Sequence, residues 1–140
     1  MQESGIRPYA FGDGQGWTCR QHGVDFALKV AELGQGRGLA VAEYTTRAGE
    51  EPPDHTHATE DEMFYVLGGA ITFRCGGQRF GLDQGGFVFL PRGIEHGYEI
   101  HGPGEVRLLV ITAPVPPAGA APGWGGFLAD VESAGDQARE

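Results

Sequence analysis

The chain has 140 residues, which suffices for one domain with one sizeable core and leaves no room for a second domain. Ten basic residues stand against nineteen acidic ones, and the net charge of −9 argues against nucleic acid and anionic membrane as partners. The N-terminus has neither a basic flank nor an apolar run, so we expect no signal peptide, no transmembrane segment and a cytoplasmic location. In that compartment Cys19 and Cys75 are expected to be free thiols.

Three regions follow one another along the chain. Residues 1–23 form an N-terminal arm, residues 24–112 a β-barrel and residues 113–140 a C-terminal arm rich in proline and glycine. The first arm carries Tyr9, Phe11 and Trp17, whose rings would be costly to leave in water. We therefore expect this arm to dock, either on its own barrel or on a second subunit.

Short runs rich in β-branched and aromatic residues fill the central region, and many of the 25 glycines fall between them. This pattern predicts an all-β sandwich or barrel with tight turns at the glycine pairs. The predicted strands cover residues 24–33, 38–46, 63–67, 70–75, 78–82, 87–90, 97–100 and 105–112.

The C-terminal arm begins with prolines and glycines that cannot hold a ladder or the interior of a helix. Residues 127–134 could then form a short amphipathic helix with Phe127, Leu128 and Val131 on one side. Trp124 and Phe127 need cover as well, and the predicted strand at 63–67 turns Met63, Tyr65 and Leu67 outward. These outward and terminal apolar groups predict a homodimer.

Two histidines and a carboxylate lie within eight residues at the start of the barrel's central hairpin. On an extended strand His55 and His57 would project from one face about 7 Å apart, close enough to share an ion. After a turn at residues 58–61, Glu62 opens the next strand and can return a carboxylate to that ion. The spacing therefore predicts a metal site.

A further ligand is expected from His96, which follows a Pro91-Arg92-Gly93 turn at the start of a strand. An antiparallel pairing could bring His96 beside Glu62. Three imidazoles and one carboxylate suit one divalent transition metal ion per subunit, namely Fe, Mn, Ni, Cu or Zn. Two alternatives stay open for Glu62: it ligates directly, or it only accepts a hydrogen bond from a ligating histidine.

The remaining candidates near this site have simpler interpretations. Glu60 and Asp61 are expected to be solvated, although either could replace Glu62 if the register differed. His22 and His101 have no supporting motif and are expected at solvated strand ends. None of these residues is predicted to bind the metal.

Both segments resemble the two motifs of the cupin superfamily. Gly49, five residues, His55-x-His57, four residues, Glu62, six residues and Gly69 match the first motif, and Gly85, Pro91-x-Gly93 and His96 are similar to the second. Ile100 stands where many members have asparagine, which puts one polar contact near the site in doubt but removes no ligand. The resemblance implies a single-domain cupin β-barrel, a jelly-roll-like double-stranded β-helix, and the ligand set His55, His57, Glu62 and His96.

Strand parity indicates which side chains share the face of the metal site. Aromatic and apolar side chains dominate the predicted pocket, although most of them could simply fill a core. Such a pocket beside a metal suits an aromatic or phenolic small molecule better than a sugar or a phosphate. The predicted pocket residues are Tyr44, Phe64, Val66, Phe73, Phe89 and Tyr98.

The segments HTHATEDEMFYVLGG and FVFLPRGIEH resemble those of small quercetinase-like dioxygenases. That likeness implies a metal-dependent oxygenase acting on an aromatic, phenolic or enolic substrate, with Glu62 as ligand and as catalytic base. A polyketide cyclase or isomerase that uses the metal as a Lewis acid is one alternative. A non-catalytic sensor or small-molecule binding module is another.

Overall fold

The computed structural model describes residues 7–21, 23–32 and 38–113. Within these residues the chain forms nine strands and no helix, as the all-β prediction requires. The strands are β1 (Trp17–Gln21), β2 (Val24–Glu32), β3 (Leu39–Thr46), β4 (Asp61–Gly68), β5 (Ile71–Cys75), β6 (Gln78–Leu82), β7 (Phe87–Leu90), β8 (His96–Ile100) and β9 (Val106–Ala113). The helix predicted at residues 127–134 lies outside the described residues.

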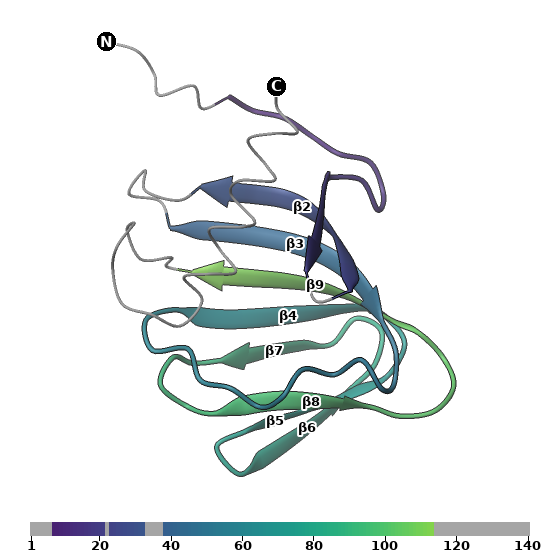
Figure 1. Ribbon diagram of the computed structural model, residues 1–140, viewed down its shortest axis with the longest axis vertical. Helices are drawn as coiled ribbons and strands as arrows, with labels where there is room; N and C mark the ends of the chain where they lie inside the picture. Colours follow the sequence, from purple (N-terminus) through teal and green to yellow (C-terminus); the bar gives the residue numbers. More distant parts are fainter. Residues whose placement is uncertain (1–6, 22, 33–37, 114–140) are drawn as a thin grey trace.

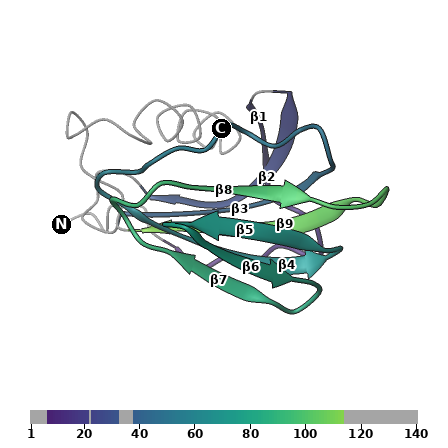
Figure 2. The ribbon, with the colours of Figure 1, turned by 90° about the horizontal axis from the view of Figure 1, so that it is seen from below.

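Two antiparallel sheets make up the fold. The larger has six strands in the order β1-β2-β3-β9-β4-β7, and the smaller has three in the order β6-β5-β8. Figure 1 shows β2, β3, β9, β4 and β7 stacked in that order, with the smaller sheet at one end. Figure 2 views the molecule from the end at which β5, β6 and β8 are nearest. The arrangement is a jelly-roll of the predicted kind.

Alternating side chains from both sheets form a single core. In β4 and β9 every second residue is buried, which is the period-two pattern of a half-buried strand. Val66 and Leu108 from the large sheet and Phe73 from the small sheet have no exposed surface. Their burial stabilises the contact between the sheets by roughly 1.5–3 kcal/mol per side chain.

Strand β1 is an element that the sequence analysis did not predict. Its sequence WTCRQ has no apolar run, but it pairs antiparallel with β2, with Trp17 opposite Leu28 and Cys19 opposite Phe26. Cys19 is buried, and both Cys19 and Cys75 are free, which confirms the prediction of unpaired thiols. The strand exists because β2 offers it a hydrogen-bonding edge.

The segment before β1 packs on the chain's own sheet. The rings of Tyr9, Phe11 and Trp17 form a cluster with centroids 5.0–5.5 Å apart, and the Tyr9 hydroxyl donates a hydrogen bond to the Lys29 carbonyl. This segment therefore docks in cis, which is one of the two expected outcomes.

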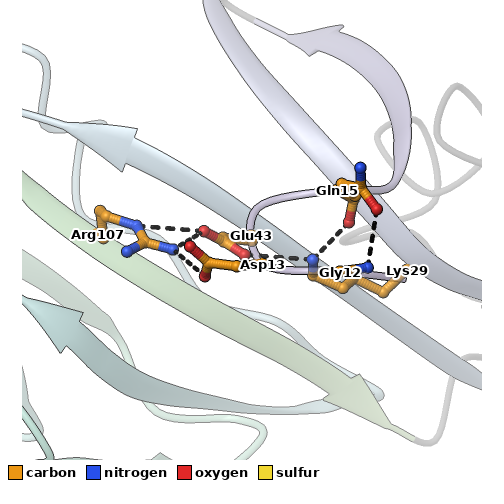
Figure 3. A network of polar contacts seen from close by, with 6 residues as sticks. All are labelled: Gly12, Asp13, Gln15, Lys29, Glu43 and Arg107. Carbon is orange, nitrogen blue, oxygen red and sulfur yellow. Dashed lines mark hydrogen bonds and ion pairs between the residues drawn. The ribbon is translucent and has the colours of Figure 1, made fainter. Parts of the chain in front are cut away.

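An ion-pair network adds to that docking (Figure 3). Arg107 contacts Glu43 at 2.5 Å and Asp13 at 3.3 Å, while Lys29 lies 3.2 Å from Glu43 and donates to the Gln15 carbonyl. Strands β2, β3 and β9 thus hold the N-terminal segment through charge as well as through apolar contact.

The outer face of β4 and β7 exposes aromatic side chains. Tyr65, Phe87 and Phe89 are 42–53% exposed, and Tyr65 lies opposite Phe87 in the ladder. The predicted homodimer would cover this face, and it stays a prediction. Among the described residues there is no helix that could cross a membrane.

Candidate metal centre

A long loop between β3 and β4 carries the first two histidines and is fastened along β8. His55 and His96 exchange two backbone hydrogen bonds of 2.9 Å each, which makes an isolated antiparallel bridge. Further along, the Glu51 carboxylate accepts the Ile100 N–H at 3.0 Å, which lowers the pKa of Glu51. The expected strand through His55 and His57 is therefore reduced to a single bridge residue, His55. The loop around it is held in place by its hydrogen bonds to β8.

Two more contacts hold the far end of this loop. Gly93 donates its N–H to the His57 carbonyl at 2.8 Å, and Gly93 has φ +82, a conformation that glycine adopts without strain. Its neighbour Arg92 binds Asp61 through its backbone N–H and its guanidinium, which lowers the pKa of Asp61. The Pro91-Arg92-Gly93 turn thus fixes the positions of His57 and Glu62 from both sides.

The structure brings together all four predicted ligands. His55, His57, Glu62 and His96 each offer one ligand atom, and these atoms all lie within 4.8 Å of one another. Glu62 Oε1 is 3.0 Å from His96 Nε2 and 3.5 Å from His57 Nε2. Neighbouring ligands at ordinary bond lengths are about 3.0 Å apart on an octahedral ion and about 3.4 Å apart on a tetrahedral one. The spacing fits a single metal ion.

His96 reaches Glu62 by a route that differs from the predicted one. The sequence analysis expected their strands to pair, but β8 pairs with β5 in the small sheet and β4 pairs with β7 and β9 in the large sheet. The two side chains instead meet across the interior between the sheets. The predicted strand pairing was therefore wrong, but the predicted contact between His96 and Glu62 was right. The contact forms because the buried faces of two packed sheets also bring side chains together.

The chemistry of the four side chains also suits a cation. His55 Nδ1 lies 2.9 Å from the Pro53 carbonyl, which can only accept, so Nδ1 carries the proton and Nε2 presents its lone pair. Glu62 is 3% exposed, and among the described residues it pairs with the imidazoles of His57 and His96. Neutral imidazoles do not balance a buried carboxylate, whereas a divalent ion would.

Glu62 itself stays ionised in this setting. Burial raises the pKa of its carboxyl, but hydrogen bonds from His57 and His96 outweigh burial and lower the pKa below the ordinary value of 4.5. A carboxylate in this state can ligate a metal or accept a proton. Both roles that the sequence analysis left open for Glu62 are compatible with this geometry.

Glu60 is a site residue that the sequence analysis missed. It was expected in solvent, yet it is 1% exposed, lies 3.7 Å from His57 Nδ1 and accepts a 2.6 Å hydrogen bond from Thr59. From there it can orient the His57 ring and fix its tautomer. The sequence did contain a signal for the burial of Glu60. Glu60 and Glu62 are two residues apart, so they share a face if the extended chain begins before β4.

A cavity of about 740 Å³ opens beside the four ligands. Three of the predicted pocket residues, Tyr44, Phe64 and Tyr98, line it together with His55, His57 and Glu62. The other residues around it were not predicted and come from the start of β2 and the residue before it, the end of β3, the long loop and β9: Gly23, Val24, Phe26, Thr46, Gly49, Glu50, Glu51, Pro52, Pro53, Thr56 and Val110. The walls are therefore aromatic and apolar, with carboxylates at the loop.

Three predicted pocket residues lie elsewhere. Val66 and Phe73 have no exposed surface and belong to the core, where Phe73 stacks on Phe64 with ring centroids 5.0 Å apart. Phe89 is 50% exposed, because the ladder places it opposite Met63 on the outer face. The alternation of β4 correctly predicted that Met63 points away from the metal site, but the register between β4 and β7, which places Phe89, could not be predicted from the sequence.

The hydroxyl groups of Tyr44 and Tyr98 meet inside the cavity at 3.0 Å. Burial raises the pKa of both phenols, that of Tyr98 to about 12, so both are protonated at neutral pH. Phe26 packs on Tyr44 with ring centroids 4.5 Å apart. The pair places two hydroxyl groups on the aromatic part of the wall.

The charge of the cavity is one-sided. Glu50, Glu51 and Glu62 line it, and none of the described lining residues is a lysine or an arginine. His101, expected in solvent, is indeed exposed and pairs with Thr72 and Glu99, away from the four ligands. Among the described lining residues, none therefore offers a free anion the permanent positive charge of a lysine or an arginine.

Comparison with known proteins agrees with the fold. A family model described as a cupin domain matches residues 42–112, just over half of the chain. An uncharacterized protein of Streptomyces coelicolor is 28% identical over 78 residues, which cover 56% of this chain and 72% of that protein.

Solved structures give the same result. The Cnp3 cupin domain of Schizosaccharomyces pombe superposes with a TM-score of 0.58 at 25% identity, over 66% of each chain, just under two thirds. An RmlC-like cupin from Shewanella frigidimarina has a TM-score of 0.63 over 79% of this chain and 93% of that one. Its identity of 19% supports the fold alone.

Proposed function

The chain belongs to the cupin superfamily, and from that premise we propose that it is a metal-dependent oxygenase acting on an aromatic, phenolic or enolic small molecule. One observation carries the proposal: three imidazoles and an ionised, buried carboxylate converge at the wall of an aromatic cavity of about 740 Å³. Cupins host many activities, so the reaction is argued from the site and not from the fold.

The residues that would hold the ion are His55, His57, Glu62 and His96. Iron, manganese, nickel, copper and zinc all accept this mixture of nitrogen and oxygen ligands. A bound ion would lower the pKa of a coordinated phenol or enol and would orient both reactants. Arg92, Asp61 and Gly93 hold the ligand loop before any ion arrives, so the site is partly organised by the protein itself.

The chain's own residues supply proton transfer and shape. Glu62 is ionised and can accept the proton that a phenolic or enolic substrate loses, because its oxygen already lies at the ligand cluster. Phe26, Phe64 and Val110 form walls that exclude water and match a flat ring. The absence of lysine and arginine among the described lining residues favours neutral substrates over free anions.

The test begins with metal analysis of protein purified without added metal. Oxygen consumption is then measured with flavonols, catechols and enediols, each with the ion found and after its removal by a chelator. Oxygen uptake that needs both ion and substrate supports the proposal. Turnover without oxygen would instead assign a cyclase or isomerase that uses the ion as a Lewis acid, and binding without turnover would assign a sensor.

We also propose that the protein is a homodimer that covers the exposed aromatic face formed by Tyr65, Phe87 and Phe89. Sedimentation equilibrium at micromolar concentration checks this, with a Tyr65→Lys, Phe87→Lys variant expected to be monomeric. A monomeric wild-type protein would contradict it. The cytoplasmic location expected from the sequence stays a prediction.

A further inference from the structure

The two tyrosine hydroxyl groups in the cavity come from opposite sheets. Tyr44 lies on β3 of the large sheet and Tyr98 on β8 of the small one, and their oxygens are 3.0 Å apart. Both residues are more than nine-tenths buried, at 8% and 7% exposure, yet both line the cavity that His55, His57 and Glu62 of the ligand cluster also line.

Counting protons shows that this pair is incomplete. Two hydroxyl groups carry two protons, and the bond between them uses one. Among the residues that the structure describes, neither hydroxyl makes another hydrogen bond. A buried donor without an acceptor is unfavourable, so the second proton calls for an acceptor that enters the cavity.

Packing does not explain the hydroxyl groups. Phe64 and the core residue Phe73 lie against Tyr98, and Phe26 lies against Tyr44, so phenylalanine rings already pack around both tyrosines. A phenylalanine at 44 or 98 would keep these ring contacts and avoid burying a polar group. The hydroxyl groups therefore add something other than apolar contact.

We propose that Tyr44 and Tyr98 form a hydrogen-bond donor pair that holds a second oxygen of the substrate, one that the metal does not bind. The inference rests on the proposed function and deepens it, because it selects neutral aromatic molecules with two neighbouring oxygen functions over those with one. The hydroxyl that accepts within the pair becomes the stronger donor to the ligand, since hydrogen bonds in a chain polarise one another. Glu50 and Glu51 at the loop make a carboxylate or a phosphate a poor competitor for this place.

The test compares two probes on zinc-loaded protein, since zinc has no redox chemistry and leaves the probe intact. 4-Nitrocatechol carries two neighbouring oxygens and 4-nitrophenol carries one, and the visible absorption of each shifts when the phenol ionises. Binding is titrated for wild type, Tyr44→Phe, Tyr98→Phe and the double variant. Tyr65→Phe on the outer face is the matched control, and metal content and melting temperature are measured throughout.

We expect 4-nitrocatechol affinity to fall about tenfold in the single variant that removes the hydroxyl donating to the probe, which corresponds to one hydrogen bond to a neutral oxygen. The other single variant should lose about threefold in affinity. The double variant should lose about as much as the single variant with the larger loss, because the two hydroxyl groups act as a unit. Affinity for 4-nitrophenol, metal content and the Tyr65→Phe control should not change.

Unchanged 4-nitrocatechol affinity in all variants would overturn the inference and leave the proposed function standing. Equal losses for both probes would also overturn it, because they indicate general damage to the cavity. If zinc-loaded wild-type protein binds neither probe, the aromatic substrate class and this inference fall together.

Discussion

Two buried carboxylates of this protein lie in contrasting surroundings. Glu43 is 8% exposed and faces the permanent cations Arg107 and Lys29, while Glu62 is 3% exposed and faces the imidazoles of His57 and His96. The pKa of each is lowered against the effect of burial. At Glu43 the neighbouring charges are permanent cations, whereas at Glu62 the neighbours are imidazoles that are themselves candidate metal ligands.

This contrast distinguishes a structural ion pair from a site prepared for a ligand. Arg107 carries its charge at every accessible pH, so the network in Figure 3 holds strands and the N-terminal segment together. Histidines can present lone pairs instead of protons, and only then does the carboxylate lack a counter-ion. A buried acid among histidines is therefore better evidence of metal binding than a buried acid beside arginine.

The largest expected effect is the loss of the ion. His57→Ala and His96→Ala should each lower metal affinity by at least about 100-fold, since even residues that only orient ligands are worth about 10- to 100-fold. Metal per subunit after dialysis measures this, with His101→Ala as the control. Full occupancy in either variant would remove the basis for treating the Glu62 region as a metal site.

Glu62→Gln separates ligation from proton transfer. If Glu62 does both, the ion stays with weaker affinity, while kcat for the substrate found by the oxygen screen drops by about 10²- to 10⁴-fold. If Glu62 only orients a histidine, metal content and rate should both fall modestly. Glu105→Gln, at an exposed acid that pairs with Arg47 away from the site, is the control, and a fully metallated, active Glu62→Gln protein would leave Glu62 with neither role.

Glu43→Gln should act on stability and leave the site intact. Removing the charge that faces Arg107 and Lys29 should lower the free energy of unfolding by about 1–2 kcal/mol at pH 7, with metal content unchanged. Urea unfolding checks this, and Asp25→Asn, which breaks a solvent-exposed pair with Arg20, should change stability immeasurably.

The same variant carries a pH signature. The folded-state pKa of Glu43 lies below its ordinary value of 4.5, so the folded protein binds fewer protons than the unfolded chain between those two values. The stabilisation is fully present above about pH 4.5 and is lost as the pH falls through the lowered value. The stability difference between wild type and Glu43→Gln should therefore shrink in acid; a constant difference would contradict this role.

The smallest expected effect concerns Phe89. Because its ring is half exposed on the outer face, Phe89→Thr should change the stability of the individual subunit by only about 0.5 kcal/mol and should leave metal binding and turnover unchanged, whatever its effect on the proposed dimer. Thermal unfolding and the oxygen assay check both. Reduced turnover in a stably folded Phe89→Thr protein would contradict the outer position of this ring and support its predicted place in the substrate pocket.

The sequence predicted those features that depend on local pattern. Alternation in β4 put Glu62, Phe64 and Val66 on one buried face and Tyr65 outside, and the motif spacing gave all four ligand candidates. Strand β1 was missed, because its order comes from pairing with β2 and not from its own residues. Long-range register escaped prediction for the same reason, as Phe89 and the route of His96 to Glu62 show.

The site was predicted less completely than its ligands. Glu60 was expected in solvent because its burial depends on neighbouring segments and cannot be predicted from the sequence of a turn alone. Phe26 and Val24 line the cavity from β2, a strand whose apolar run says nothing of which cavity it borders. Tyr44 and Tyr98 were both expected near the pocket, but their mutual hydrogen bond depends on how two sheets pack.

The reach of the four ligands across the sequence has a consequence for folding. Glu62 and His96 are 34 residues apart and belong to different sheets, so an ion between them would cross-link the chain much as a disulfide does. The ion would bind the native state and would not bind the unfolded ensemble. The melting temperature should then climb with the logarithm of free metal concentration, and chelation should loosen both sheets at once.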